Sequence, residues 1–405
     1  MMRFDDLKIV APASKSYLQR ALAIASLARG TSVLTNVSWS NDSRAAAEIV
    51  KNFGATLSES HGDLTVQSSG LHLKTDSYTA GEAGLSIRMF SPVLALDNVK
   101  VTFTGEGSLL TRPVGIIADA LSQLGAKVAA NNGLLPLTIQ GPLQPGTVHI
   151  DGSLSSQILT GLLMALPLLK GDSIILVDNL KSKPYIDMTL SIMHHFGVEV
   201  EHEYYRVFRV KGHQQYKAAR YNVEGDWSGA AFFLVLGAVK GRVEVMNLNT
   251  KSSQADRQIV SALEKAGAEV KRSNNSVVVE KKELNAFEFD ATDCPDLFPP
   301  LACLASRCKG TSIIKGVSRL THKESNRAET IKQEFKKMGI DIMLKNDLML
   351  ITGSEPIPCI IDSHNDHRIA MAGGIMNLFC ASGSIRVKNR EAVNKSYPGF
   401  FEEVG

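Results

Sequence analysis

A short pattern recurs along this 405-residue chain: a helix-like segment ends in glycine, and a strand-like segment follows. The five clearest copies are KNFGATL, SQLGAKV, HHFGVEV, EKAGAEV and KKMGIDI, with Gly54, Gly125, Gly197, Gly267 and Gly339. Successive glycines lie 71, 72, 70 and 72 residues apart. Glycine favours the left-handed position that ends a helix. Because chance would not keep these spacings so even, the sequence predicts a repeated structural unit.

A second series of glycines supports the same repeat. It comprises LARGTSVL, LLKGDSII, AVKGRVEV, RCKGTSII and CASGSIRV, with Gly30, Gly171, Gly241, Gly310 and Gly383. Their steps are 141, 70, 69 and 73 residues, and the first equals two repeats. We expect Asn98 to replace the missing glycine, because Asn tolerates the same backbone conformation. Together the two series predict an α/β (α+β) chain with six copies of a unit that has two helices and several strands.

The ends of the chain indicate how the copies divide into domains. The sixth copy begins near Gly383, and the sequence ends at Gly405. We therefore expect residues 4–11 to supply its missing strand. One domain would then be residues 13–224, and the other would be residues 225–405 completed by residues 1–12. Ligands commonly bind near such domain boundaries, and Lys15 lies at one of them.

Composition excludes several classes of protein. The 44 Lys and Arg residues nearly balance the 41 Asp and Glu residues, so no nucleic acid or membrane partner is expected. The five cysteines lie in the last third of the chain without a CxxC pair, which favours reduced thiols and a cytoplasmic location. No metal-ligand spacing, signal peptide or membrane-spanning run is present, and the longest apolar run is Ile158 to Leu169. We expect chemistry without a metal or other cofactor.

The stretch PASKSYLQR, residues 12–20, predicts an anion site. Leu7 to Val10 suit a short buried strand, and Pro12 ends it. Ser14 is a good N-cap for an apolar helix, which places Lys15, Ser16 and Arg20 in the first turns. Free N–H groups and the positive end of the helix dipole favour a phosphate or carboxylate there. The alternative is a capped helix with solvated cations.

Three other loops precede a predicted helix and could contact a ligand. They have neutral hydrogen-bond donors, or glycines that let the backbone approach the ligand closely. Glycines and hydroxyl or amide side chains at a helix start can bind a phosphate, although tight turns and N-caps use the same residues. The loops are GEAGLSIR with Gly84 and Arg88, GSLSSQ with Ser155, Ser156 and Gln157, and KSKPYID with Ser182 and Tyr185.

The C-terminal half contributes cations and carboxylates. In RLTHKESNR we expect Lys323, Glu324 and Arg327 to share one helical face, the alternative being a surface ion-pair helix. In HNDHR, Asp366 is the expected N-cap and the cations that follow it are locally unfavourable unless an anion binds. DCPDLFPP places Asp296 at a helix start, where it is either a cap or a base. Lys395 follows in NKSYPGFF.

These motifs in this order resemble the enolpyruvyl transferases, most closely the 5-enolpyruvylshikimate-3-phosphate synthases. The resemblance runs from about Val10 to Phe401 and rests on SKS-x3-R, SSQ, SKPYID, EGD, KES-x2-R, NDHR and K-x-x-P. It implies two domains that form an inverse α/β barrel, each with three repeats of a βαβαββ-type unit around parallel helices. It also implies a monomer that transfers the enolpyruvyl group of phosphoenolpyruvate to the 5-hydroxyl of shikimate 3-phosphate and releases phosphate.

The resemblance also implies roles for individual residues. The residues implied to bind shikimate 3-phosphate are Lys15, Ser16, Arg20, Ser155, Ser156, Gln157, Ser182, Tyr185, Asp296 and Lys323. The residues implied to bind phosphoenolpyruvate are Lys15, Gly84, Arg112, Arg327, His367, Arg368 and Lys395. The implied catalytic residues are Asp296, which accepts the hydroxyl proton, and Glu324 with Lys15, which handle protons at the methylene carbon and leaving phosphate.

The chain departs from the family pattern at four positions. The usual Gly-Asn-Ala-Gly-Thr is Gly-Glu-Ala-Gly-Leu at residues 81–85, so Glu82 adds a negative charge and Leu85 lacks a hydroxyl. Asn326 replaces the usual Asp before Arg327. Arg319 stands where an Asn often binds the shikimate phosphate.

Three rival interpretations remain. Transfer to UDP-N-acetylglucosamine is disfavoured because most of that branch has a cysteine in the loop corresponding to residues 105–112, and no cysteine precedes Cys294 here. An enzyme that processes RNA phosphates would favour clustered aromatic platforms and a net basic surface, whereas aromatic content is 6% and net charge is +3. An inactive anion-binding scaffold is disfavoured by the presence of Asp296 and Glu324.

Overall fold

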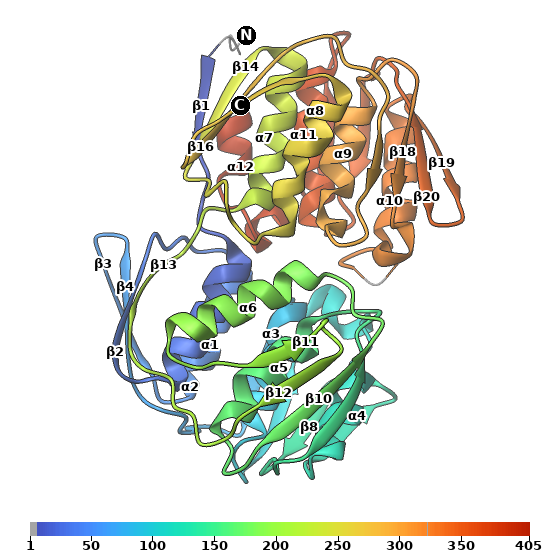
Figure 1. Ribbon diagram of the computed structural model, residues 1–405. Coiled ribbons are helices and arrows are strands. Elements are labelled where there is room, and N and C mark those ends of the chain that lie inside the picture. Colours follow the sequence, from blue (N-terminus) through green and yellow to red (C-terminus); the bar gives the residue numbers. More distant parts are fainter. Residues whose placement is uncertain (1–5, 322) are drawn as a thin grey trace. The chain divides into compact units, whose positions relative to one another are not determined.

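The computed structural model describes residues 6–321 and 323–405 (Figure 1). The chain forms two compact units, each a mixed α/β structure. One unit is continuous and comprises Lys15–Val223. The other combines the N-terminal residues up to Ser14 with Glu224–Gly405.

The continuous unit contains three four-stranded sheets with one shared plan. In each sheet two neighbouring strands are parallel, and two further strands extend the sheet antiparallel. In sheet order the strands are β13 (Arg220–Asn222), β2 (Arg29–Thr35), β4 (Asp63–Ser69) and β3 (Thr56–Ser60); β5 (Ser77–Thr79), β6 (Lys100–Thr104), β8 (Leu134–Gln140) and β7 (Lys127–Asn131); and β9 (Thr147–Asp151), β10 (Ser173–Asp178), β12 (Val207–Val210) and β11 (Glu201–Glu203).

The helices of this unit are largely apolar and buried. They are α1 (Lys15–Leu27), α2 (Asn41–Asn52), α3 (Gly84–Leu94), α4 (Gly115–Gln123), α5 (Gln157–Ala165) and α6 (Lys183–His195), with 3₁₀ turns η2 (Gly107–Thr111) and η3 (Leu166–Leu168). Every residue from Tyr17 to Leu27 is buried, as expected of a helix that is not exposed on any face. Gly161 lets α5 approach α3 closely, because a Cβ there would lie 2.5 Å from the carbonyl oxygen of Met89.

The second unit repeats this plan with one incomplete sheet. Its sheets are β1 (Leu7–Val10), β14 (Arg242–Met246), β16 (Ser276–Glu280) and β15 (Glu269–Arg272); β17 (Glu288–Asp290), β18 (Thr311–Lys315), β20 (Leu348–Thr352) and β19 (Asp341–Lys345); and the pair β21 (Cys359–Asp362) and β22 (Ile385–Lys388). Its helices are α7 (Trp227–Lys240), α8 (Ile259–Ala266), α9 (Phe298–Ala305), α10 (Arg327–Lys337), α11 (His367–Phe379) and α12 (Phe400–Val404), with 3₁₀ turns η4 (Ala255–Gln258), η5 (Pro295–Leu297), η6 (Val317–Leu320) and η7 (Arg390–Lys395). Within the described residues, no helix has the length and apolar character needed to cross a membrane.

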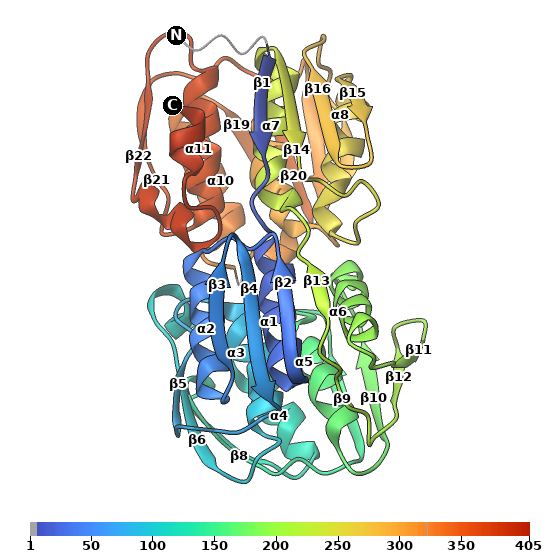
Figure 2. The same ribbon diagram turned by 90° about the vertical axis from the view of Figure 1, so that its left-hand side faces the viewer.

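The N-terminal strand joins a different copy from the one predicted. Figure 2 shows β1 beside β14, and Leu7 pairs in parallel with Val243. It does not complete the last copy, where β22 is the only strand of the described residues that pairs with β21. The reason is strand direction: β21 already fills the parallel position, and the strands that this copy lacks in the described chain are the antiparallel ones. A strand that pairs in parallel cannot replace those.

The helix-ending glycines behave as predicted. Their φ angles are +99° at Gly54, +87° at Gly125, +81° at Gly197, +100° at Gly267 and +80° at Gly339. The expectation for Asn98 is wrong, since its φ is not positive. Gly171, Gly241 and Gly383 of the same series also lie outside the left-handed region, so these turns do not all require that conformation.

Candidate functional site

Lys15 begins α1 as predicted, and its charge is compensated by Asp42. The Nζ atom of Lys15 lies 2.8 Å from Oδ2 of Asp42, and the exposed fractions of the two side chains are 18% and 11%. Asp42 is in the first turn of α2, which follows a capping box formed by Ser40 and Ser43. Sequence reasoning did not identify Asp42 as a partner, although the capping box was a signal for the helix that carries it.

Arg20 contacts two of the other predicted residues, Ser16 and Tyr185. Its Nη1 donates to the carbonyl oxygen of Ser16 at 2.9 Å, and its Nε donates to Oγ1 of Thr189 at 2.9 Å. The guanidinium carbon lies 5.9 Å from the centre of the Tyr185 ring. Burial lowers the pKa of Arg20 to about 10, which is still high enough for it to be a cation at neutral pH.

The Arg20 contacts continue to α5. Oγ1 of Thr189 lies 3.2 Å from Oγ1 of Thr160, which in turn donates to the carbonyl oxygen of Ser156 at 3.4 Å. Ser156 occupies the N-cap position of α5 without a capping hydrogen bond from its side chain, whereas Oγ of Ser155 accepts from the N–H of Gln157 at 3.1 Å. Ser182 precedes α6 in the left-handed conformation, with φ +57°. The starts of α1 and α5 are therefore linked through α6.

A second cation, Arg88, links α3 with α5. It donates to Oε1 of Gln157 at 3.1 Å and to the carbonyl oxygens of Gly84 at 3.2 Å and Pro113 at 3.1 Å. Arg112 lies against Gly84, because a Cβ at Gly84 would be 2.7 Å from both of its terminal nitrogens. Gln157 and Arg112 therefore both lie close to Gly84, the first through Arg88 and the second by direct packing.

Asp296 is the centre of a cluster of cations in the other unit. Its carboxylate lies 3.2 Å from Nζ of Lys323, 2.8 Å from Nη1 of Arg327 and 3.2 Å from Nη2 of Arg368. Burial opposes its ionisation, but Arg368, Lys323 and Arg327 outweigh burial and hold the pKa of Asp296 well below its usual range. Asp296 is not the cap of η5, because it lies inside this turn and Cys294 occupies the N-cap position.

Arg327 is fully buried and contacts three carboxylates. Besides Asp296, it donates to Oε2 of Glu324 at 2.6 Å and to both oxygens of Asp366 at 2.9 and 3.2 Å. Burial lowers the pKa of Arg327, but Asp366, Glu324 and Asp296 more than reverse this and raise it. The exposed fraction of the Arg327 side chain is 0%, which argues against a surface ion-pair helix.

The predicted shared helical face is wrong. Helix α10 begins at Arg327, and Lys323 and Glu324 lie in the irregular segment before it. The residues nevertheless meet, because Asp296 and Asp366 approach from other loops. Lys323 and Arg327 meet through their long-range ion pairs with Asp296, whereas Glu324 contacts Arg327 through a local pair three residues apart.

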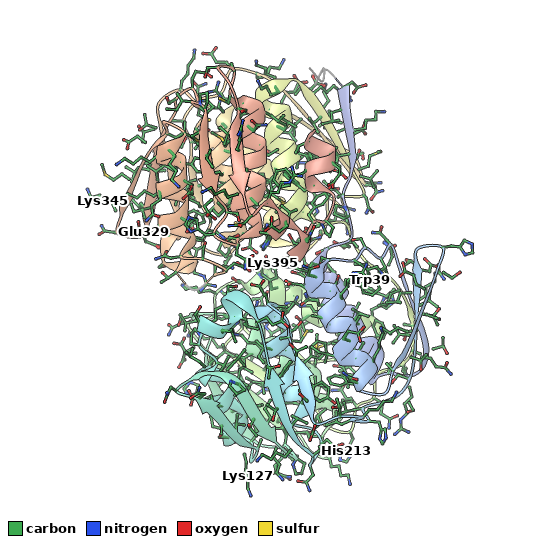
Figure 3. All side chains as sticks on the ribbon, turned by 180° about the vertical axis from the view of Figure 1, so that it is seen from behind. Trp39, Lys127, His213, Glu329, Lys345 and Lys395 are labelled. Carbon is green, nitrogen blue, oxygen red and sulfur yellow. The ribbon has the colours of Figure 1, made fainter. Side chains whose placement is uncertain are left out.

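Asp366 caps α11 as predicted, and its carboxylate accepts from the N–H of Arg368 at 3.0 Å. His367 and Arg368 occupy the first turn, where the carboxylate of Asp296 partly offsets their unfavourable placement. The Nε and Nη1 atoms of Arg368 are buried and have no hydrogen-bond partner among residues 6–321 and 323–405. Lys395, labelled in Figure 3, donates to the carbonyl oxygen of Asn365 at 2.7 Å.

A buried acid that sequence reasoning missed lies in the same unit. Asp256 accepts from Oγ of Ser228, a residue in the first turn of α7, and that helix is capped by Asp226. Burial, and then Asp296, raise the pKa of Asp256 to about 6, while Arg368 and Ser228 act in the opposite sense. The EGD motif marked Asp226 in the sequence, but no local pattern marked Asp256.

Arg319 lies in η6, outside the contacts described for Asp296. Burial lowers its pKa, whereas Asp293 and Asp296 oppose this change. Across the described ranges, no group of three or more His, Cys, Asp or Glu residues could hold a metal ion. The arrangement instead offers positive charge, neutral donors and two candidate acid–base groups, Asp296 and Glu324, which suits proton transfer on an anionic substrate.

Comparison with known proteins identifies relatives over nearly the whole chain. The profile of the family "EPSP synthase (3-phosphoshikimate 1-carboxyvinyltransferase)" matches residues 6–404. A 3-phosphoshikimate 1-carboxyvinyltransferase from Clostridium kluyveri is 39% identical, with 97% of this chain and 92% of that protein covered. One from Methanocorpusculum labreanum is 38% identical, with 97% and 94% covered. The structure of EPSP synthase from Acinetobacter baumannii superposes with a TM-score of 0.82 and 25% identity, covering 98% and 95% of the two chains.

Proposed function

Since this chain belongs to the EPSP synthase family, we propose that the residues gathered at the starts of its helices bind and activate the two substrates of that reaction. The protein is a 3-phosphoshikimate 1-carboxyvinyltransferase of the shikimate pathway, which leads to chorismate and the aromatic amino acids. It transfers the enolpyruvyl group of phosphoenolpyruvate to shikimate 3-phosphate and releases phosphate.

In this proposal, shikimate 3-phosphate binds to hydroxyl, amide and charged side chains, most of them near helix starts. Those residues are Lys15, Ser16, Arg20, Ser155, Ser156, Gln157, Ser182, Tyr185, Asp296 and Lys323. Hydrogen bonds from Arg20 through Thr189 and Thr160 to Ser156 support the assignment, because they hold a cation and hydroxyl residues at adjacent helix starts. Cations and N–H groups at helix starts favour a phosphate.

Phosphoenolpyruvate, with its carboxylate and phosphate, binds to a more cationic set in the proposal. That set is Lys15, Gly84, Arg112, Arg327, His367, Arg368 and Lys395. Two observations support it. Arg368 has two buried donors without a hydrogen-bond partner among the described residues, and Nε of Arg112 is in the same condition. Buried guanidinium donors are costly to leave unpaired, so an anionic ligand would satisfy them.

The contacts of Asp296 are the single observation that carries the catalytic part of the proposal. In the free enzyme Lys323, Arg327 and Arg368 keep Asp296 ionised, so it is ready to accept a proton. When the same cations bind anionic substrate groups, their effect on Asp296 weakens and its pKa rises, which makes it a stronger base. Asp296 then accepts the proton of the 5-hydroxyl as that oxygen attacks C2 of phosphoenolpyruvate.

Glu324 and Lys15 complete the proton transfers in this proposal. C3 of phosphoenolpyruvate gains a proton as the tetrahedral adduct forms, and it loses a proton when phosphate leaves. Glu324 has the required carboxyl group and is held by Arg327 at 2.6 Å. Lys15, as a cation, offsets the negative charge that develops on the leaving phosphate.

The test is phosphate release from phosphoenolpyruvate with shikimate 3-phosphate, compared with UDP-N-acetylglucosamine. Release only with shikimate 3-phosphate is expected, and release only with the nucleotide sugar would overturn the choice of acceptor. Absence of release with either would favour the inactive scaffold. The family match does not favour these alternatives.

The finer architecture is also part of the proposal. We infer that each domain is built from three copies of a βαβαββ-type unit that form an inverse α/β barrel around parallel helices. The shared strand order of the five four-stranded sheets supports this view. The proposal assigns residues 13–224 mainly to shikimate 3-phosphate, and residues 225–405 with residues 1–12 mainly to phosphoenolpyruvate and catalysis. It also describes a cytoplasmic monomer, and the five free thiols support that location.

A further inference from the structure

Two loops that follow the parallel strands β5 and β6 carry Glu82 and Ser108. Thr79 at the end of β5 pairs with Thr104 at the end of β6. Because the strands are parallel, the loops that follow them leave from the same edge of the sheet. The first loop leads to Gly84 at the start of α3, and the second contains η2 and ends at Arg112.

The carboxylate of Glu82 ties these two loops together. Its Oε2 accepts from the backbone N–H of Ser108 at 3.0 Å and from the Ser108 hydroxyl at 3.3 Å. Gly107 makes this contact possible, since it has φ +51° and a Cβ there would collide with the Glu82 carboxylate. A backbone hydrogen bond from Glu106 to the carbonyl oxygen of Gly81, at 2.7 Å, adds a second tie between the same loops.

Two other sheets also have a side-chain contact between segments at the ends of their parallel strands, although not at the same distance from the strand ends. Lys323, after β18, contacts Asp296, after β17, at 3.2 Å. Asn389, after β22, donates to Asp362, at the end of β21, at 3.1 Å. The sequence separations are 27 and 27 residues, compared with 26 for Glu82 and Ser108. The similar separations follow from the register of the paired parallel strands, which brings the segments at their ends close together in each sheet.

The position of Arg112 depends on the loop that Glu82 holds. Arg112 follows η2 directly, and its N–H donates to Leu109 at 3.2 Å. Its guanidinium is buried against the backbone of Gly84, and its Nε has no hydrogen-bond partner in the parts of the chain that the structure describes. Packing against Gly84 and the course of the loop are thus the contacts that place this cation.

We propose that Glu82 is a positioning residue: its carboxylate fixes the loop of residues 105–112 so that Arg112 lies over Gly84 and can bind the anionic groups of phosphoenolpyruvate. This rests on the proposed role of Arg112 as a phosphoenolpyruvate ligand. A carboxylate suits the task, because one oxygen accepts from both donors of Ser108 and the charge strengthens both hydrogen bonds. Glu82 thus supports anion binding indirectly: its carboxylate accepts hydrogen bonds from Ser108, and this contact holds the loop that carries the cation Arg112.

The variant Glu82→Gln separates positioning from direct repulsion. If Glu82 positions Arg112, removing the charge weakens the contact with Ser108, and KM for phosphoenolpyruvate should rise about fivefold to tenfold while kcat changes less than about twofold. If Glu82 instead mainly repelled phosphoenolpyruvate, the same variant should lower that KM. The matched control is Glu106→Gln, which removes an exposed carboxylate from the same loop and should leave KM unchanged.

A second readout does not depend on turnover. Hydrogen exchange of the full-length protein, measured by mass spectrometry, should be about tenfold faster in residues 105–112 of Glu82→Gln than in the wild type or Glu106→Gln. Unchanged exchange, or an unchanged or lowered KM for phosphoenolpyruvate, would overturn the proposal. Arg112→Ala tests the underlying function separately: if its KM for phosphoenolpyruvate is normal, Arg112 is not the ligand, while the exchange result still decides whether Glu82 holds the loop.

Discussion

Nη1 of Arg327 lies 2.8 Å from Oδ1 of Asp296, although neither residue was expected to bind the other. The same guanidinium contacts Glu324 and Asp366, and Asp296 contacts Lys323 and Arg368. Three cations therefore face three carboxylates, and the formal charges cancel. A substrate anion entering this cluster must compete with carboxylates for its cations, so binding and the basicity of Asp296 are coupled.

Replacing Arg327 by Met should destabilise the protein by about 3–5 kcal/mol, because Glu324 and Asp366 lose the buried cation that they share and Asp296 loses one of its three cations. The measurement is urea unfolding of the purified variant. Lys336→Met is the control, since Lys336 is an exposed cation on the same helix and its loss should cost less than about 0.5 kcal/mol. Equal losses for the two variants would contradict the importance assigned to these buried contacts.

Lys15→Met should reduce kcat/KM by at least about a hundredfold, because the cation proposed to contact both substrates is lost. It should also cost about 1–3 kcal/mol of stability, since the mostly buried Asp42 carboxylate loses its partner. The double variant Lys15→Met with Asp42→Asn should recover most of the stability and none of the activity. Recovery of activity in the double variant would show that Lys15 acts only through structure.

Glu324→Gln should lower kcat by about a hundredfold and change both KM values less than about threefold, as expected of a group that transfers a proton. The amide oxygen can still accept from Arg327, so the geometry of the cluster is kept. Steady-state kinetics across pH provides the check, because one limb of the profile should disappear. An unchanged kcat, for this variant or for Glu324→Ala, would remove Glu324 from the proton-transfer role.

Asp256 should make stability fall as pH rises from about 4 to 7. Burial raises its pKa from 3.8 to about 6, so the folded protein favours the protonated acid. The contribution of Asp256 to the free energy of unfolding is fully present below the pKa that Asp256 has in the unfolded chain. It is lost as pH rises through the pKa of Asp256 in the folded protein. Asp256→Asn cannot titrate, so its stability relative to the wild type should increase by about 3 kcal/mol across this range. Urea unfolding at several pH values provides the measurement, and a difference that is independent of pH would contradict the expectation.

Local patterns predicted the parts of the fold that depend on a few neighbouring residues. The glycines at Gly54 and Gly267 end helices because a left-handed residue is needed there and glycine adopts it without strain. Asp366 caps α11 because a short acidic side chain accepts from the N–H two residues ahead. The order of motifs from SKS to K-x-x-P also predicted the family, which the relatives confirm.

The same local reasoning could not identify partners that come from elsewhere in the chain. Lys15 and Asp42 are 27 residues apart, Glu82 and Ser108 are 26 apart, and Arg327 and Asp366 are 39 apart. The expected helical face of Lys323, Glu324 and Arg327 failed because α10 begins only at Arg327, and Asp296 on another loop contacts both Lys323 and Arg327.

The sequence by itself therefore determined the helix-ending glycines, the helix starts at Lys15 and His367 and the family. Only the tertiary structure decided that β1 pairs with β14, that Asp256 is buried beside Ser228, and that Glu82 contacts Ser108. The physical reason is that helix ends and turns depend on backbone geometry within a few residues. Strand pairing depends instead on segments that are far apart in the sequence. Ion pairs likewise form where loops from distant parts of the chain come close together.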